Sequence, residues 1–179
     1  DIDQVLRASQ YRDEFELHQR WAVRTRDLQR ALLDTQPEIV HFCGHGEGAA
    51  GLALEDASGQ PKLVSTAALA SLFQLCSDHI NCVLLNACYA EVQANAIVEA
   101  INYVIGMRQA VPDSVAIAFS TGFYQAIGTG QSVEDSFDSG RAAIRQMGKS
   151  KGTGRAISVV GVSHGGTLAI PDDEIPVLK

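Results

Sequence analysis

Two short apolar runs constrain this chain more than any other feature of its sequence: IVHFC at residues 39–43 and CVLLN at residues 82–86. Each has the length of a strand that is covered on both faces rather than that of a buried helix. Between them, residues 66–78 carry apolar side chains at helical spacing. Strands separated by a helix of this length pair in parallel, with the crossover helices on the faces of the sheet. The chain is therefore predicted to be an α/β protein.

The rest of the sequence continues this alternation. Residues 51–56 and 61–64 are apolar runs separated by a Ser-Gly turn, which predicts a hairpin. YVIGM at residues 103–107 predicts another strand, and FELHQRWAV at residues 15–23 alternates as a strand with one exposed side. Residues 156–171 are compatible with one or two strands or with a loop. Helices are predicted at residues 2–8, from a cap at Thr25 to residue 34, from a cap at Ser65 to residue 78, and at residues 92–100, 115–127 and 133–147.

Composition narrows the classes of protein. With 179 residues, 46% of them hydrophobic, the chain has the size of one domain, residues 1–179. Its net charge of -7 argues against nucleic-acid binding, which depends on cationic side chains that neutralise phosphates. Four cysteines without a secretory signal predict free thiols in a reducing compartment, the cytoplasm. Residues 114–133 lack charge but contain glycines and polar residues, which favours a buried helix and turn over a membrane span.

A chemically reactive residue follows each of the two apolar runs. His45 lies two residues after the first run, and Cys88 lies two residues after the second. If the strands are neighbours, about 4.8 Å apart, their loops bring an imidazole and a thiol to the same edge of the sheet. A histidine beside a cysteine stabilises the nucleophilic thiolate, and the N–H groups of Gly46 and Cys88 are candidates for an oxyanion hole. The alternative is that Cys88 packs as a small buried hydrophobe and His45 lies in a turn.

These blocks resemble the CHAT domains of the caspase-like cysteine peptidases, the relatives of caspases, metacaspases and separases. The resemblance rests on IVHFCGHGEG followed by the hairpin, on VLLNACYAE some forty positions later, and on YVIGMRQAVPDSVAIAFSTGFYQAIGTGQSVEDSF, with IPVLK as the tail. It implies a caspase-like three-layer sandwich, in which helices flank a mostly parallel central sheet and a short hairpin follows the histidine loop. It also implies peptide hydrolysis without a cofactor, with His45 as general base, Cys88 as nucleophile, and Gly46 and Cys88 as oxyanion donors.

Two features depart from the family pattern. Family members normally begin with a central apolar strand before the first helix; this sequence has none, so we expect it to be an excerpt of a longer chain. Relatives that cut after arginine have an acidic residue just past the strand at residues 103–107, where this chain has Met107, Arg108 and Gln109. The resemblance thus implies a substrate pocket near Met107 and Gln109 without a preference for basic residues. Asp113 is a further candidate for this pocket, although capping its helix is the simpler interpretation.

Two rival sites have weaker support. GEGAAG, residues 46–51, matches the glycine fingerprint of dinucleotide-binding loops, but it leads into a hairpin instead of a helix. A zinc site built from Cys43, His45, Cys82 and Cys88 fails on distance, because Cys82 and Cys88 bracket a strand and are expected to lie about 20 Å apart. We therefore expect no metal, and Cys82 and Cys76 are predicted to pack in the core.

Structural roles account for the other histidines and the aromatic residues. His41 is predicted to be a hydrogen-bonded interior residue, His79 to lie at the end of a helix, and His164 to lie in a loop. Trp21 and the aromatic cluster within residues 119–124 are predicted to line the core or a groove.

Two classes of function follow from these residues and from the resemblance. The first is a cysteine endopeptidase that hydrolyses a protein substrate, within a bacterial signalling or defence protein whose sensor or repeat domains control access to the groove. The second is a catalytically silent module that keeps the fold and serves in protein interaction. His45 and Cys88 are both present among small residues, which favours the enzyme. Neither function requires nucleic acid or a membrane as a partner.

Overall fold

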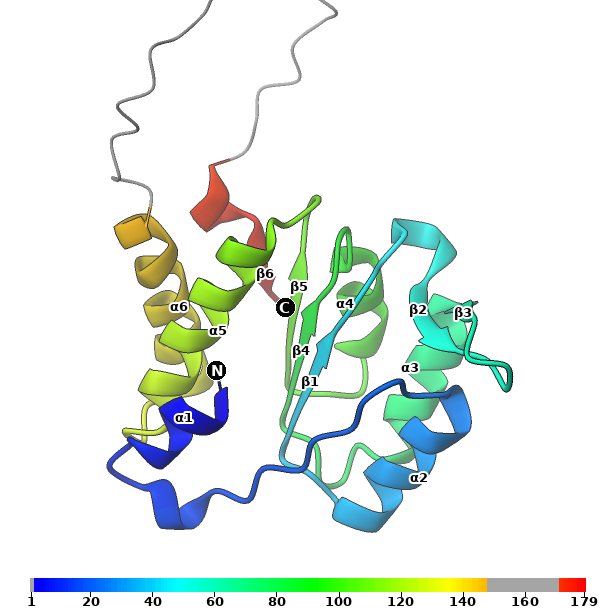
Figure 1. Ribbon diagram of the computed structural model, residues 1–179, viewed down its shortest axis with the longest axis horizontal. Helices are drawn as coiled ribbons and strands as arrows, with labels where there is room; N and C mark the ends of the chain where they lie inside the picture. The colour runs from blue at the N-terminus through cyan, green and yellow to red at the C-terminus, as the bar shows by residue number, and fades with distance from the viewer. Residues whose placement is uncertain (1, 148–170) are drawn as a thin grey trace, which may run out of the picture.

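The computed structural model describes residues 2–147 and 171–179, which form three layers around a central sheet (Figure 1). The sheet has the order β1-β4-β5-β6. Strands β1 (Ile39–Cys43), β4 (Cys82–Asn86) and β5 (Tyr103–Met107) are parallel, and β6 (Pro176–Leu178) runs antiparallel to β5. The predicted three-layer sandwich with a mostly parallel sheet is confirmed.

Helices cover both faces of this sheet. Helices α2 (Thr25–Thr35), α3 (Thr66–Leu75) and α4 (Glu91–Ile97) lie on one side, and α1 (Ile2–Arg7), α5 (Asp113–Ile127) and α6 (Val133–Met147) lie on the other (Figure 1). Alternate residues of β4 enter the two cores: Val83 and Leu85 on one face, Cys82 and Leu84 on the other. Every residue of β4 is buried, which explains why its sequence is apolar throughout.

A separate hairpin follows β1. Strands β2 (Leu52–Glu55) and β3 (Pro61–Val64) pair antiparallel, as predicted. The Asp56 carboxylate closes the turn by accepting the Ser58 N–H at 2.7 Å and the Gln60 N–H at 3.0 Å. The Ser58 hydroxyl also donates to this carboxylate at 2.7 Å, and it lowers the pKa of Asp56 together with the two backbone N–H groups. Gly59 supplies the left-handed backbone of the turn with φ +77°.

The strand predicted at residues 15–23 is wrong. This segment is irregular after the short 3-10 helix η1 (Arg12–Glu14), and it touches a sheet only at its end, where the Glu55 N–H donates to the Val23 carbonyl at 3.0 Å. A strand needs a hydrogen-bonded neighbour, and among the described residues β1 is an edge strand with which residues 15–23 do not pair. Trp21 is accordingly 83% exposed, which contradicts its predicted place in the core or a groove.

Several helix ends differ from the predicted ones by a few residues. Thr25 is the first residue of α2, and Arg24 takes the cap position. Asp113 is likewise the first residue of α5 after Pro112, where its charge complements the helix dipole without capping it. The cap at Ser65 is confirmed, because its hydroxyl accepts the Ala68 N–H at 3.3 Å. Helix α3 ends at Leu75 rather than at residue 78, and α4 begins at residue 91 and ends at residue 97 rather than 100.

The C-terminal segment extends the sheet. The 3-10 helix η3 (Asp172–Glu174) is fixed to α6, because Arg141 donates to the Asp173 carbonyl at 2.7 Å and Arg145 pairs with the Asp173 carboxylate at 2.9 Å. The chain then enters β6. The strands or loop predicted at residues 156–170, with His164, lie outside the described residues. Within the described residues, no helix has both the length and the apolar character needed to cross a bilayer.

Candidate active site

The two strands that precede His45 and Cys88 are direct neighbours, which is the condition that a shared site at this edge requires. Strand β1 pairs with β4 in parallel, with Ile39 opposite Cys82 and Cys43 opposite Asn86. The pairing continues one residue further, since the Gly44 N–H donates to the Asn86 carbonyl at 3.2 Å. Both loops therefore begin at the same carboxyl edge of the sheet, which is where ligands bind in open α/β folds.

The backbones of these two loops touch at Gly46. A Cβ built at this glycine would run into the carbonyl oxygen of Cys88 and would lie 3.2 Å from the Cβ of Ala87. No side chain fits there unless the backbone moves. The glycine after His45 is therefore required by close approach to the cysteine segment, and this contact places the two segments against each other.

Hydrogen bonds to the hairpin fix the histidine loop. The Ala53 N–H donates to the His45 carbonyl at 2.9 Å, and the Glu47 N–H donates to the Gly51 carbonyl at 3.0 Å. Residues 45–47 thus lie beside β2 as a short antiparallel strand, with His45 exposed. The loop continues into a single 3-10 turn, η2 (Gly48–Ala50), and then into β2. A dinucleotide fingerprint needs an α-helix directly after the glycines, because the helix N-terminus binds the phosphates. Here a strand follows them instead.

The segment after β4 bends sharply at Tyr89. This residue has φ +57°, a left-handed conformation that is uncommon for a residue with a side chain. The Tyr89 N–H donates to the Gln109 carbonyl at 3.2 Å, so the segment is also joined to the loop after β5. Backbone strain of this kind concentrates at functional sites. Cys88, half-buried, comes immediately before the bend, and α4 begins three residues later.

Within the part of the chain that the structure describes, the two predicted oxyanion donors have no hydrogen-bond acceptor. Across residues 2–147 and 171–179, neither the Gly46 N–H nor the Cys88 N–H donates a hydrogen bond, whereas the amides of Glu47, Ala87 and Tyr89 all do. Buried or half-buried amides are nearly always paired, so an unpaired donor on each of the two touching loops is available to an external oxygen.

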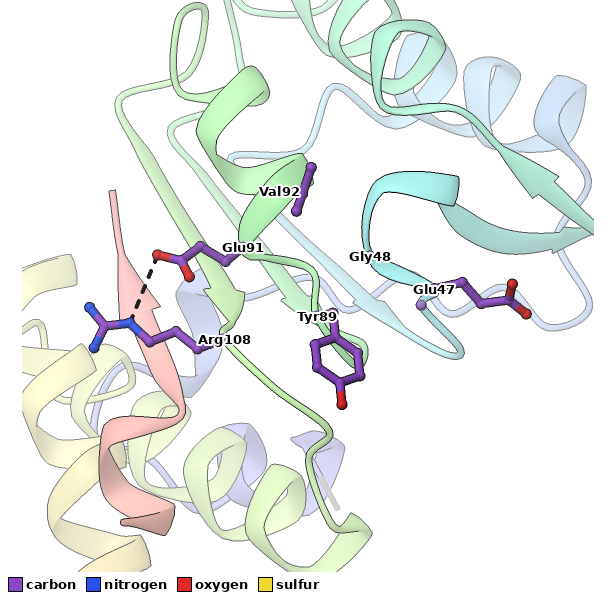
Figure 2. Close-up of a pocket in the computed structure, with 7 residues that line it drawn as sticks. Glu47, Gly48, Tyr89, Glu91, Val92 and Arg108 are labelled. Atoms are coloured by element: carbon purple, nitrogen blue, oxygen red, sulfur yellow. Dashed lines mark ion pairs between the residues drawn. The ribbon is translucent and has the colours of Figure 1, made fainter. Parts of the chain in front are cut away.

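An open hollow of about 510 Å³ borders this edge. Figure 2 shows that Tyr89 and Val92 face the backbone of Glu47 and Gly48 across it. The hollow therefore lies between the segment that follows Cys88 and the loop that carries His45. Gly46 and Tyr89, the chain neighbours of His45 and Cys88, line the hollow, whereas His45 and Cys88 themselves do not.

Charged side chains form the far wall of this hollow. Glu91 pairs with Lys179 at 2.7 Å and, more loosely, with Arg108 at 3.8 Å, as Figure 2 shows for the second pair. Neither Tyr89 nor Glu91 was identified from the sequence, because their places depend on the left-handed bend and on the distant C-terminal strand. Arg108 was noted only as the residue that stands where arginine-cutting relatives have an acid.

The residues predicted for a substrate pocket lie in three different environments. Met107 is 0% exposed and packs in the core formed by β4, β5, α5 and α6, so its side chain does not reach the surface. The Gln109 carbonyl accepts the Tyr89 N–H. Asp113 is exposed at the start of α5. Arg108, the residue after Met107, lines the hollow instead. Successive side chains of a strand point to opposite faces, so Arg108 faces away from the core that Met107 enters.

His41 occupies the interior beneath the site. It stacks on Tyr124 with ring centroids 5.7 Å apart, and neither of its ring nitrogens bonds to an atom of the described residues. The prediction that it is interior is confirmed, and the prediction that it is hydrogen-bonded is wrong. Burial lowers the pKa of His41 to about 4 and also raises the pKa of Tyr124. His41 is therefore neutral at pH 7.

We expect the stability of the protein to fall between pH 6.5 and pH 4 because of His41. The unfolded histidine, with a pKa of 6.5, binds a proton in this range, and the folded one, with a pKa of about 4, does not. Stability is thus fully present above pH 6.5 and is lost as the pH falls, by about 3 kcal/mol in total. Urea denaturation at pH 7.5 and 4.5 measures this loss. The variant His41→Leu should show a smaller loss than wild type, whereas His79→Leu, at an exposed position, should not.

The four cysteines occupy distinct environments. All are free thiols: Cys43 is exposed, Cys88 is half-buried, and Cys76 and Cys82 are buried, as predicted for the last two. Burial raises the pKa of Cys82 to about 12 and raises that of Cys76 as well. In the part of the chain that the structure describes, no three His, Cys, Asp or Glu side chains gather as metal ligands would.

Comparison with known proteins agrees with the fold. Residues 2–153 match the family model described as the CHAT domain, which is most of the chain. The chain belongs to the CHAT family. A curated relative named Roc-COR-CHAT protease, from an unknown prokaryotic organism, is 23% identical over 131 residues. The match covers 70% of this CHAT chain but only 12% of the relative, so the chain spans about an eighth of that protein's length. Family and fold together identify a caspase-like sandwich.

Proposed function

We propose that this CHAT chain is a cysteine endopeptidase in which Cys88 is the nucleophile and His45 the general base. One observation carries the proposal: the backbone of Gly46 lies directly against that of Cys88, with the unpaired amides of both residues at the same edge of the sheet. A nucleophile, a base and two oxyanion donors are the elements that acyl transfer requires. The word protease in the name of the relative supports the same reaction class.

In the proposed mechanism the His45 imidazole takes the proton of the Cys88 thiol, and the resulting thiolate attacks the carbonyl carbon of the scissile peptide bond. The negative charge that develops on the carbonyl oxygen is stabilised by the N–H groups of Gly46 and Cys88. His45 then gives its proton to the leaving amine as the C–N bond breaks, which leaves a thioester on Cys88. Water, deprotonated by His45, hydrolyses this thioester and restores the enzyme. These steps need no cofactor.

The hollow beside the site is proposed to hold a residue of the substrate. Tyr89 and Val92 supply apolar surface, and Arg108 with Glu91 supplies a charged wall. Gln109 and Asp113 lie on the loop after β5 and the helix that follows, and their contact with substrate stays a prediction. Because Met107 is buried, we leave its side chain out of the proposed pocket.

The chain is proposed to act as one domain of a longer bacterial signalling or defence protein in the cytoplasm. The short coverage of the relative and the additional terms Roc and COR in its name support a protein in which neighbouring domains regulate the peptidase. Four free thiols fit a reducing compartment.

Residue-resolved alkylation with iodoacetamide tests the dyad before any substrate is known. In the intact protein at pH 7, Cys88 should react at least about tenfold faster than the exposed Cys43, because in the proposed dyad the His45 imidazole accepts the proton of the Cys88 thiol during attack. His45→Ala should slow Cys88 to the rate of Cys43, and the control His79→Ala should leave the ratio unchanged. If Cys88 reacts no faster than Cys43 in wild type, the silent interaction module is the better interpretation.

A further inference from the structure

A buried glutamine joins the histidine loop to the helix that follows the cysteine. Gln93 lies on α4 and is 0% exposed. Its Nε2 donates to the Gly48 carbonyl at 2.7 Å and to the Thr66 hydroxyl oxygen at 2.8 Å. A single side chain therefore connects the loop after His45, the start of α3, and α4.

The chemistry of these contacts fixes the orientation of the amide. The Gly48 carbonyl is only an acceptor, so the nitrogen of the Gln93 side chain must face it. The Gln93 Oε1 is then buried with no partner in the described part of the chain. An unpaired buried oxygen is unfavourable, so packing alone does not account for a glutamine at this position. An apolar residue of the same size could not donate the two hydrogen bonds to Gly48 and Thr66, and these bonds account for the glutamine.

The loop segment that Gln93 holds is in an unusual conformation. Gly48 has φ +54°, and its carbonyl also accepts the Gly51 N–H at 3.1 Å. A carbonyl in a left-handed turn on an exposed loop is readily displaced unless a partner holds it. Gln93 provides this partner from inside the molecule. The carbonyl that it holds belongs to Gly48, three residues after His45.

The same helix fixes the position of the cysteine. Helix α4 begins three residues after Cys88, and the Ala94 N–H within its first turn bonds to the Ala90 carbonyl at 3.0 Å. Gln93 thus lies five residues after Cys88, on the helix that the cysteine segment enters. The link from Cys88 through α4 and Gln93 to Gly48 is independent of the pairing between β1 and β4.

We propose that Gln93 is a positioning residue that sets His45 and the Gly46 N–H at the correct distance from Cys88. This inference rests on the proposed cysteine peptidase function and adds a residue to it. Gln93 touches no reacting atom in this scheme. It acts through Gly48, because misplacement of a base by about 1 Å is enough to slow a reaction by orders of magnitude.

The test compares Gln93→Met with two control variants in the intact protein. Methionine has nearly the length of glutamine and removes both donated hydrogen bonds. Thr66→Val removes one partner of Gln93 but keeps the bond to Gly48. Ile97→Val removes a methyl group from the core one turn later on the same helix, which controls for weakened packing of α4.

Two measurements are made on each variant. The first is the rate at which iodoacetamide alkylates Cys88, relative to Cys43 in the same molecule. The second is amide hydrogen exchange at Glu47 and Gly51, which bond within the loop. We expect Gln93→Met to slow alkylation of Cys88 at least fivefold and to speed exchange at both amides, while both controls stay within twofold of wild type.

The outcomes separate the two proposals. If wild-type Cys88 is fast and Gln93→Met leaves it fast, the positioning role is overturned and the dyad stands. If exchange at Glu47 and Gly51 does not change in Gln93→Met, Gln93 does not hold the loop, and the inference is also overturned. If wild-type Cys88 reacts no faster than Cys43, the proposed function fails first, and the positioning role falls with it.

Discussion

Replacing Gly46 with alanine is expected to destabilise the protein by about 1–3 kcal/mol and to slow peptide hydrolysis by at least about 100-fold. The added methyl group would occupy the position of the Cys88 carbonyl oxygen. Because both partners are backbone, relief requires the two loops to separate. That separation moves His45 away from Cys88 and turns the Gly46 N–H away from the oxyanion.

Gly44→Ala is the matched control for this prediction. It adds the same methyl group to the same loop, but there the Cβ would meet the ring of Phe42 at 2.9 Å, and the end of a flexible side chain can move aside. Chemical denaturation and alkylation of Cys88 should therefore change little in Gly44→Ala and strongly in Gly46→Ala. Equal effects of the two variants would show that close approach to Cys88 is not the reason for a glycine at position 46.

The second large effect is expected from the reactive residues themselves. Cys88→Ala and His45→Ala should each lower cleavage of a peptide library by at least about 10⁴-fold, because the covalent route is lost. Stability should change little, since His45 is exposed and Cys88 is half-buried. Mass spectrometry of the cleaved library measures the loss, and circular dichroism of each variant confirms that it is folded.

Cys43→Ala and His79→Ala are the controls for these two variants. Cys43 lies at the end of the neighbouring strand β1, and its thiol is the exposed one among the four cysteines. It is not among the nearest contacts of a Cβ built at Gly46. Both control variants should cleave the library at the wild-type rate. A loss in Cys43→Ala equal to that in Cys88→Ala would move the nucleophile to β1 and contradict the proposed assignment.

The sequence was sufficient to predict the three parallel strands of the sheet and the shared edge at which the loops after β1 and β4 begin. Strand β4 is apolar at all five positions because both of its faces are covered, and β1 follows the same pattern less strictly. Parallel pairing then followed from the helix between them, and the shared edge of the loops followed from parallel pairing. The features predicted best are those set by local pattern and by the general rules of α/β topology.

Features that depend on distant contacts could not be predicted. Apolar and polar residues alternate over residues 15–23 as in a strand, but the segment has no neighbouring strand with which to pair among the described residues. Trp21 within it is exposed. The left-handed bend falls on Tyr89 rather than on a glycine, so the sequence carries no signal for it. Gln93 falls within the helix predicted at residues 92–100, and only the folded chain shows that it meets Gly48, 45 residues earlier.

The central claim is that His45 and Cys88 act as one unit. Comparing the cleavage rates of wild type, His45→Ala, Cys88→Ala and the double variant tests it most directly. We expect the double variant to cleave at the same residual rate as Cys88→Ala, because the base has no role without the nucleophile. A further fall in the double variant equal to the loss caused by His45→Ala alone, or wild-type cleavage by Cys88→Ala, would contradict the claim.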